Sequence, residues 1–146
     1  MTQEQALERA KTLLQEGRHS CAVCKEDKIY TSDDRGIRPL VLWLRADAQE
    51  TAESKKILQN AAAADKVIGR AAALLFAHGG ISALWADILS ESAAEILREQ
   101  GIPYSCGKLV PAIRNRDNTG YCPMETRAKD ITSPQEAFAV FDGVVK

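Results

Sequence analysis

The chain has 146 residues, of which 45% are hydrophobic and 27% charged, a composition that predicts one folded domain over residues 1–146 and excludes wholesale disorder. Nineteen basic and twenty acidic residues give a net charge of -1, so no overall field attracts nucleic acid or an anionic membrane. The longest apolar stretch, residues 71–77, is too short to cross a bilayer, and the charged N-terminus lacks the apolar region of a secretory signal. We therefore expect a cytoplasmic protein without a nucleic acid or membrane partner, and a homo-oligomer is compatible with the sequence.

The N-terminal third contains a predicted helix and a predicted β-hairpin. Apolar residues at helical spacing predict a helix from about residue 3 to 16, which Gly17 ends. Residues 20–31 read as two short strands joined by a charged turn. Cys21 and Cys24 form a C-x-x-C pair, but residues three apart on a strand point to opposite faces. We expect both thiols to be small buried core residues rather than zinc ligands or a redox pair.

The rest of the chain alternates predicted helices and strands. A helix should begin at Pro39, and the polar residues 47–60 form either a further helix or an ordered linker. Residues 65–78 predict a buried helix, residues 83–89 a buried strand, and residues 102–105 a short strand. Ser92 and Glu95 match a capping box that opens a helix ending at Gly101. This order of elements predicts a three-layer α/β domain.

The first candidate site is the predicted start of the helix over residues 65–78. Asp65 and Lys66 stand there, where the positive end of a helix dipole favours an anion. One interpretation is that Asp65 only caps the helix and Lys66 is solvated. However, Asp65 would share a helical face with the small residues Gly69 and Ala72, and an ionised group on a buried face needs a partner. The pattern therefore also indicates a site.

The second candidate is Cys122, which follows a turn-rich loop over residues 115–121. Pro123 suits the first position of a helix, so the thiol would stand at the N-cap, with Glu125 at the third position. A helix N-terminus acidifies a thiol, which would make Cys122 a candidate nucleophile. The alternative is a structural cysteine at the end of a loop.

The third candidate is a set of arginines in two loops: Arg35, Arg38, Arg114 and Arg116. Guanidinium groups suit phosphate or carboxylate, although arginines in loops are also common on ordinary surfaces. His19 and His78 do not show the spacing of metal ligands, so we predict neither a metal site nor a cofactor.

Residues 65–73 and 115–125 resemble a small prokaryotic family of unknown function whose members adopt a cytidine-deaminase-like fold. Residues 35–40 and 107–111 also resemble it. The resemblance implies an α/β/α domain with a mixed sheet flanked by helices. Zinc deaminases need His-x-Glu at one helix start and Pro-Cys-x-x-Cys at the next. The corresponding positions here, residues 64–66 and 90–95, contain no histidine or cysteine, so zinc-dependent deamination is not expected.

Two functions follow from these observations. The first is a binding or regulatory domain whose cleft binds a small anionic or nucleotide-like molecule near Asp65 and Lys66. Its expected binding residues lie in two loops: Arg35, Gly36, Arg38, Asn115, Arg116 and Asp117. The second is a metal-independent enzyme in which Cys122 is the nucleophile and Asp65 or Lys66 transfers protons. Hydrogen-bond reach between the Cys122 sulfur and Asp65 or Lys66 would favour the enzyme.

Overall fold

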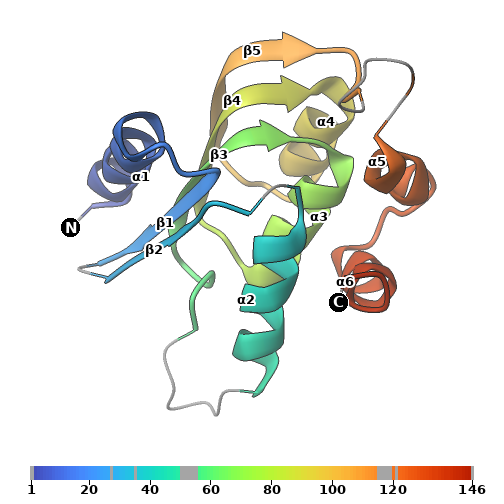
Figure 1. Cartoon of the computed structure of the whole chain (residues 1–146), viewed down its shortest axis with the longest axis horizontal. Helices are drawn as coiled ribbons and strands as arrows, with labels where there is room; N and C mark the ends of the chain where they lie inside the picture. Colours follow the sequence, from blue (N-terminus) through green and yellow to red (C-terminus); the bar gives the residue numbers. More distant parts are fainter. Residues whose placement is uncertain are drawn as a thin grey trace.

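The computed structural model describes residues 2–26, 28–34, 36–49, 56–114, 120 and 122–145. These residues form a sheet with helices on both of its faces (Figure 1). The elements in chain order are α1 (Gln3–Gly17), β1 (Cys21–Lys25), β2 (Lys28–Ser32), α2 (Arg38–Gln49), β3 (Ala62–Ile68), α3 (Arg70–Gly79), β4 (Ala83–Ser90), α4 (Glu91–Glu99), β5 (Tyr104–Val110), α5 (Pro123–Ala128) and α6 (Pro134–Asp142).

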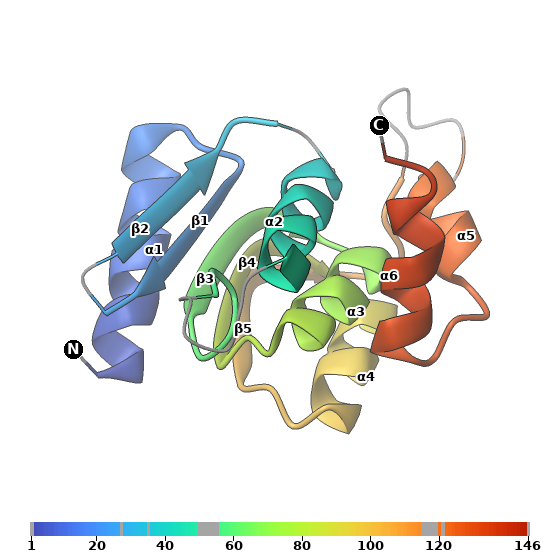
Figure 2. The same ribbon diagram turned by 90° about the horizontal axis from the view of Figure 1, so that it is seen from below.

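The sheet has the strand order β2-β1-β3-β4-β5 and is mixed. Strand β1 is antiparallel to both of its neighbours, whereas β3, β4 and β5 are parallel to one another. Helix α1 packs on one face, and α2, α3, α4 and α6 lie on the other side (Figures 1 and 2). The predicted α/β fold with helices in layers on both faces of a mixed sheet is therefore confirmed. No described helix is long and apolar enough to cross a membrane.

The hairpin forms as predicted, and its two cysteines lie on opposite faces of the sheet. Cys21 packs with Val23 in the core beneath α2 and α3, whereas Cys24 packs with Ala22 in the core beneath α1. Their exposed fractions are 1% and 0%. Strand β1 is buried on both faces because it lies between β2 and β3 and helices cover it from either side.

Helix α1 matches its predicted range and is fixed at its start by a capping box. The backbone N–H of Gln5 donates to the Thr2 hydroxyl at 3.1 Å, and the backbone N–H of Thr2 donates to the Gln5 side chain at 2.9 Å. The buried face of α1 includes Ala6 and Ala10, which pack with the alanines of β3. Small side chains on both elements allow close packing.

The predicted helix over residues 65–78 is wrong in its first five residues. Residues 65–68 belong to β3, and the helix begins only at Arg70, with Gly69 as its N-cap. Asp65 is therefore not at a helix start, and it shares no helical face with Gly69 and Ala72. It is the middle residue of the central strand β3, paired with Cys21 of β1 and Ala86 of β4.

The predicted capping box at Ser92 is also wrong. The N-cap of α4 is Ser90, whose hydroxyl accepts the backbone N–H of Ala93 at 3.0 Å. Strand β5 is longer than predicted and runs from Tyr104 to Val110. The stretch over residues 47–60 begins inside α2, and residues 50–55 lie outside the described residues. The buried carboxylate of Asp47, in α2, accepts the backbone N–H groups of Ile57 at 2.8 Å and Leu58 at 3.3 Å. The part of this stretch that follows residue 55 is therefore ordered.

Candidate functional site

A cleft of about 570 Å³ lies at the carboxyl end of β3, and we name it the Asp65 cleft. Its lining comes from the end of α1, both sides of the hairpin, the end of β3, the start of α3 and the segment leading into α5. It comprises Arg18, Ser20, Asp33, Gly36, Ile37, Asp65, Lys66, Val67, Gly69, Ala72, Ile113, Cys122, Met124 and Glu125. Open α/β sheets bind ligands at the carboxyl ends of their parallel strands, and this cleft has that position.

Asp65 is 7% exposed and lines the wall of this cleft. Burial raises its pKa from the ordinary 3.8 to about 7, because desolvation penalises the charged form. The backbone of Val67 and Lys66 and the Cys21 thiol act in the opposite direction and lower the pKa. The net result is a carboxyl group that exchanges its proton near neutral pH.

The Cys21 thiol is the strand partner of Asp65 and responds to it. Burial raises the pKa of Cys21 well above its usual value, and the charge of Asp65 and their hydrogen bond raise it further. The thiol therefore stays protonated and donates to the carboxylate. Beneath the cleft, Asp65 and Cys21 form a buried acid–thiol pair that the sequence interpretation of Cys21 as a simple core residue did not include.

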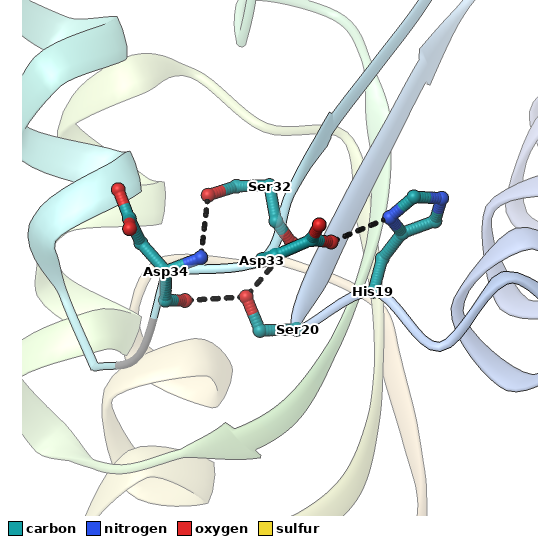
Figure 3. Close-up of polar contacts among 5 residues, drawn as sticks. All are labelled: His19, Ser20, Ser32, Asp33 and Asp34. Carbon is teal, nitrogen blue, oxygen red and sulfur yellow. Dashed lines mark hydrogen bonds and ion pairs between the residues drawn. The ribbon is translucent and has the colours of Figure 1, made fainter.

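The rim of the cleft beside the hairpin is held by serine and aspartate hydrogen bonds (Figure 3). The Ser20 hydroxyl donates to the carbonyl of Ser32 at 2.8 Å and also to that of Asp34. His19 Nδ1 lies 2.8 Å from Asp33 Oδ1. The backbone N–H of Lys66 donates to the carbonyl of Ser20 at 3.1 Å, which fixes this rim against β3.

Glu125 joins α5 to the start of α3. Its carboxylate accepts the backbone N–H groups of Arg70 at 2.6 Å and Ala71 at 3.0 Å, two donors that have no partner within the helix. A side chain at position 69 would collide with this carboxylate, so Gly69 is required for the approach. The sequence interpretation did not assign Glu125 to the cleft, although its place three residues after Cys122 was noted.

Arg70 fixes the other end of α5. Its guanidinium donates to the carbonyl of Ala128 at 3.0 Å, to that of Ile131 at 3.0 and 2.6 Å, and to the Ser92 hydroxyl at 3.0 Å. Ala128 is the last residue of α5, Ile131 lies three residues beyond it, and Ser92 belongs to α4. Arg70 and Glu125 therefore cross-link α3, α4 and α5 and hold Cys122 at the mouth of the cleft.

The structure brings four of the predicted site residues to one cavity: Gly36, Asp65, Lys66 and Cys122. Cys122 is the N-cap of α5 with Pro123 at the first helical position, as predicted. Arg38 is exposed, 3.4 Å from the carboxylate of Asp34, and does not line the cleft. Arg114 is exposed and lies four residues after the end of β5. The remaining predicted binding residues, Arg35, Asn115, Arg116 and Asp117, lie outside the described residues.

Two further observations concern the chemistry of the cleft. Among the described side chains, no hydrogen bond joins the Cys122 thiol to Asp65 or Lys66. Within the same described set, no group of three or more His, Cys, Asp or Glu residues is placed to hold a metal ion. The residue that sequence reasoning missed most clearly is Arg18, which lines the cleft from the end of α1.

The burial of the four cysteines predicts an order of alkylation. We expect iodoacetamide at neutral pH to modify Cys122 and Cys106, which are half-buried, before Cys21 and Cys24, which are fully buried. The buried thiols should react only at the rate of local opening of the hairpin. Peptide mass mapping over time measures the order, and equal rates for Cys21 and Cys122 in folded protein would contradict it.

Comparison with known proteins places the chain among proteins of undetermined activity. Residues 9–144 match the family described as TM1506, Domain of unknown function (DUF1893). The chain belongs to this family. It is similar to the crystal structure of a DUF1893 family protein (TM1506) from Thermotoga maritima, with a TM-score of 0.82 and 21% identity, covering 99% of this chain and 92% of that one. No curated protein matches the chain.

The DUF1893 match confirms the sequence-based expectation of a family without a known function. The structural likeness shows a shared fold over nearly the whole chain. The relation of this DUF1893 domain to cytidine deaminases stays a prediction.

Proposed function

We propose that the Asp65 cleft binds a small anionic or nucleotide-like molecule and that the chain is a binding or regulatory domain on a deaminase-like scaffold without a zinc site. The buried carboxyl group of Asp65 carries the proposal. With a pKa of about 7, it is part protonated and part ionised near neutral pH. The protonated form has one O–H donor beside an acceptor oxygen, which matches the paired donor and acceptor of an amide-like ring edge.

The surroundings of Asp65 suit a polar ligand of moderate size. Perturbed carboxyl groups in clefts are typical of functional sites. Lys66, the next residue, is exposed and lines the same cleft, so it supplies a positive charge beside the carboxyl group. The volume of about 570 Å³ lies within the range of small-molecule sites.

A titration of labelled protein with nucleosides and nucleoside monophosphates tests the proposal. We expect a bound compound to shift the amide resonances of Asp65, Gly69 and Ala72. Asp65→Asn should weaken its binding about tenfold, because the variant loses one hydrogen bond between the carboxyl group and the compound. Asp130→Asn, which changes an exposed carboxylate outside this cleft, is the matched control. Equal affinity in wild type and Asp65→Asn, or no saturable shifts with any compound, would contradict the proposal.

The second candidate function is a metal-independent enzyme, and the position of Cys122 in the same cleft favours it. In that case Cys122 attacks the bound molecule and Asp65 or Lys66 transfers protons. A compound found in the titration is incubated with the protein and then recovered for mass analysis. Conversion that disappears in Cys122→Ser supports the enzyme, whereas unchanged recovery supports a binding domain.

A further inference from the structure

A second cavity adjoins the Asp65 cleft on the side of the sheet that α1 covers. It has a volume of about 300 Å³, and we name it the Trp85 cavity. Leu14, Gln15, Arg18, Lys66, Trp85 and Asp87 line it. Arg18 and Lys66 also line the Asp65 cleft, so these two cations stand where the two cavities meet.

The backbone fixes both cations at this junction. Arg18 is the C-cap of α1 and adopts a left-handed conformation with φ 59° and ψ 27°, which glycine or asparagine adopts more readily. Lys66 follows Asp65 on β3, and its backbone N–H donates to the carbonyl of Ser20 at 3.1 Å. The turn between Arg18 and Ser20 therefore brings the end of α1 beside the end of β3.

Three of the four carboxylates around the junction are engaged elsewhere in the protein. Asp33 pairs with His19 at 2.8 Å, and Glu125 accepts two backbone N–H groups of α3. Asp65 is buried and accepts backbone and thiol donors. Asp87 lines the Trp85 cavity, but among the described residues it forms no ion pair with Arg18 or Lys66, and no other described carboxylate does so. Arg18 and Lys66 therefore line the two cavities without an ion pair among the described residues, with the Asp87 carboxylate in the wall of the Trp85 cavity.

We propose that Arg18 and Lys66 together bind one anionic group, a phosphate or a carboxylate, of a small molecule that extends from the Asp65 cleft towards the Trp85 cavity. The inference rests on the proposed function and names the chemical class of its ligand. The guanidinium fork of Arg18 suits two oxygens of such an anion, and the ammonium of Lys66 adds a point charge. A neutral ligand would leave both exposed charges to solvent.

Inorganic pyrophosphate and malonate test the anion site without an organic scaffold, at ionic strength held constant with chloride. Arg18→Gly removes the guanidinium and suits the left-handed backbone, so the variant should fold. Lys66→Gln removes the ammonium. We expect saturable binding of at least one anion to wild type by calorimetry, weakened about tenfold or more in each variant, since each loses a charge-assisted hydrogen bond.

Two exposed cations outside both cavities serve as controls. Arg9→Gln lies on α1 and Lys108→Gln on β5, and neither residue lines the two cavities. Both variants should bind within about twofold of wild type if the effect is local rather than one of net charge. Equal weakening in all four variants, or no saturable binding of either anion, would overturn the anion site.

The result is separable from a failure of the proposed function. A neutral nucleoside that binds the Asp65 cleft while neither anion binds wild type would leave the proposed function and overturn the anion site. Anion binding that depends on Arg18 and Lys66, with no organic compound shifting the resonance of Asp65, would support the anion site and contradict the proposed function.

Discussion

Between about pH 4 and pH 8, the free energy of unfolding of Asp65→Asn should rise by about 4 kcal/mol relative to that of wild type. The folded pKa of about 7 lies above the ordinary 3.8, so between these values the folded protein holds one proton more than the unfolded chain. Wild-type stability then falls as pH rises through this window and is level above it. The asparagine variant lacks this titration, so its stability relative to wild type should rise over the same range.

Urea unfolding at several pH values measures this difference directly, because all other titrating groups cancel in the subtraction. Asp87→Asn is the control, since its exposed side chain meets water in both the folded and the unfolded state. Its curve should stay parallel to that of wild type. An Asp65→Asn curve that also stays parallel, within about 1 kcal/mol, would show that the carboxyl group is not desolvated by folding.

The elements that could be predicted from the sequence are those whose pattern agrees with their environment. Helix α1 has an apolar stripe, a polar face and a glycine at its end, and the hairpin has short apolar runs around a charged turn. Strand β4 is a compact apolar run between polar residues. In each case the side chains alone indicate both the type of element and its buried face.

Strand β3 could not be predicted because its sequence contradicts its environment. Residues 61–64 are four alanines, the residue with the highest helix propensity, and after six more residues the apolar run of α3 begins. The position between β1 and β4 determines their conformation, since a central strand covered on both faces needs small buried side chains more than it needs β propensity. The sequence pattern therefore predicts a helix that begins at Asp65, where the structure has a strand.

The candidate site also contains residues that the sequence identifies and residues that only the fold brings together. Asp65, Lys66 and Cys122 were singled out by residue type, and the fold brings them to one cleft although Asp65 stands on a strand. Arg18 and Glu125 acquire their positions only through tertiary structure. Arg18 depends on the turn that brings the end of α1 beside β3, and Glu125 on the close approach that Gly69 allows. Local sequence contains no signal for either contact.

The second large expected effect is a loss of stability when the Arg70 hydrogen bonds that join α3 to α5 are removed. Arg70→Ala should lower the free energy of unfolding by about 3 kcal/mol, because the carbonyl of Ile131 loses its guanidinium donors and that of Ala128 keeps only the backbone N–H of Ile131. Arg70→Lys should recover only part of this loss, since a single ammonium cannot reproduce the spread of the guanidinium donors over three acceptors. Denaturant unfolding with an unchanged m-value measures both variants.

Arg98→Ala provides the matched control, because the Arg98 guanidinium makes one exposed hydrogen bond to the Tyr104 hydroxyl at 2.9 Å. Its loss should stay within about 0.5 kcal/mol. The position of the Arg70 contacts predicts where the damage appears: amide hydrogen exchange should accelerate in α5 and leave α1 unchanged. Since Cys122 stands at the start of α5, its alkylation should accelerate as well. A stability loss no larger than that of Arg98→Ala, with unchanged exchange in α5, would mean that packing rather than Arg70 holds this wall of the Asp65 cleft.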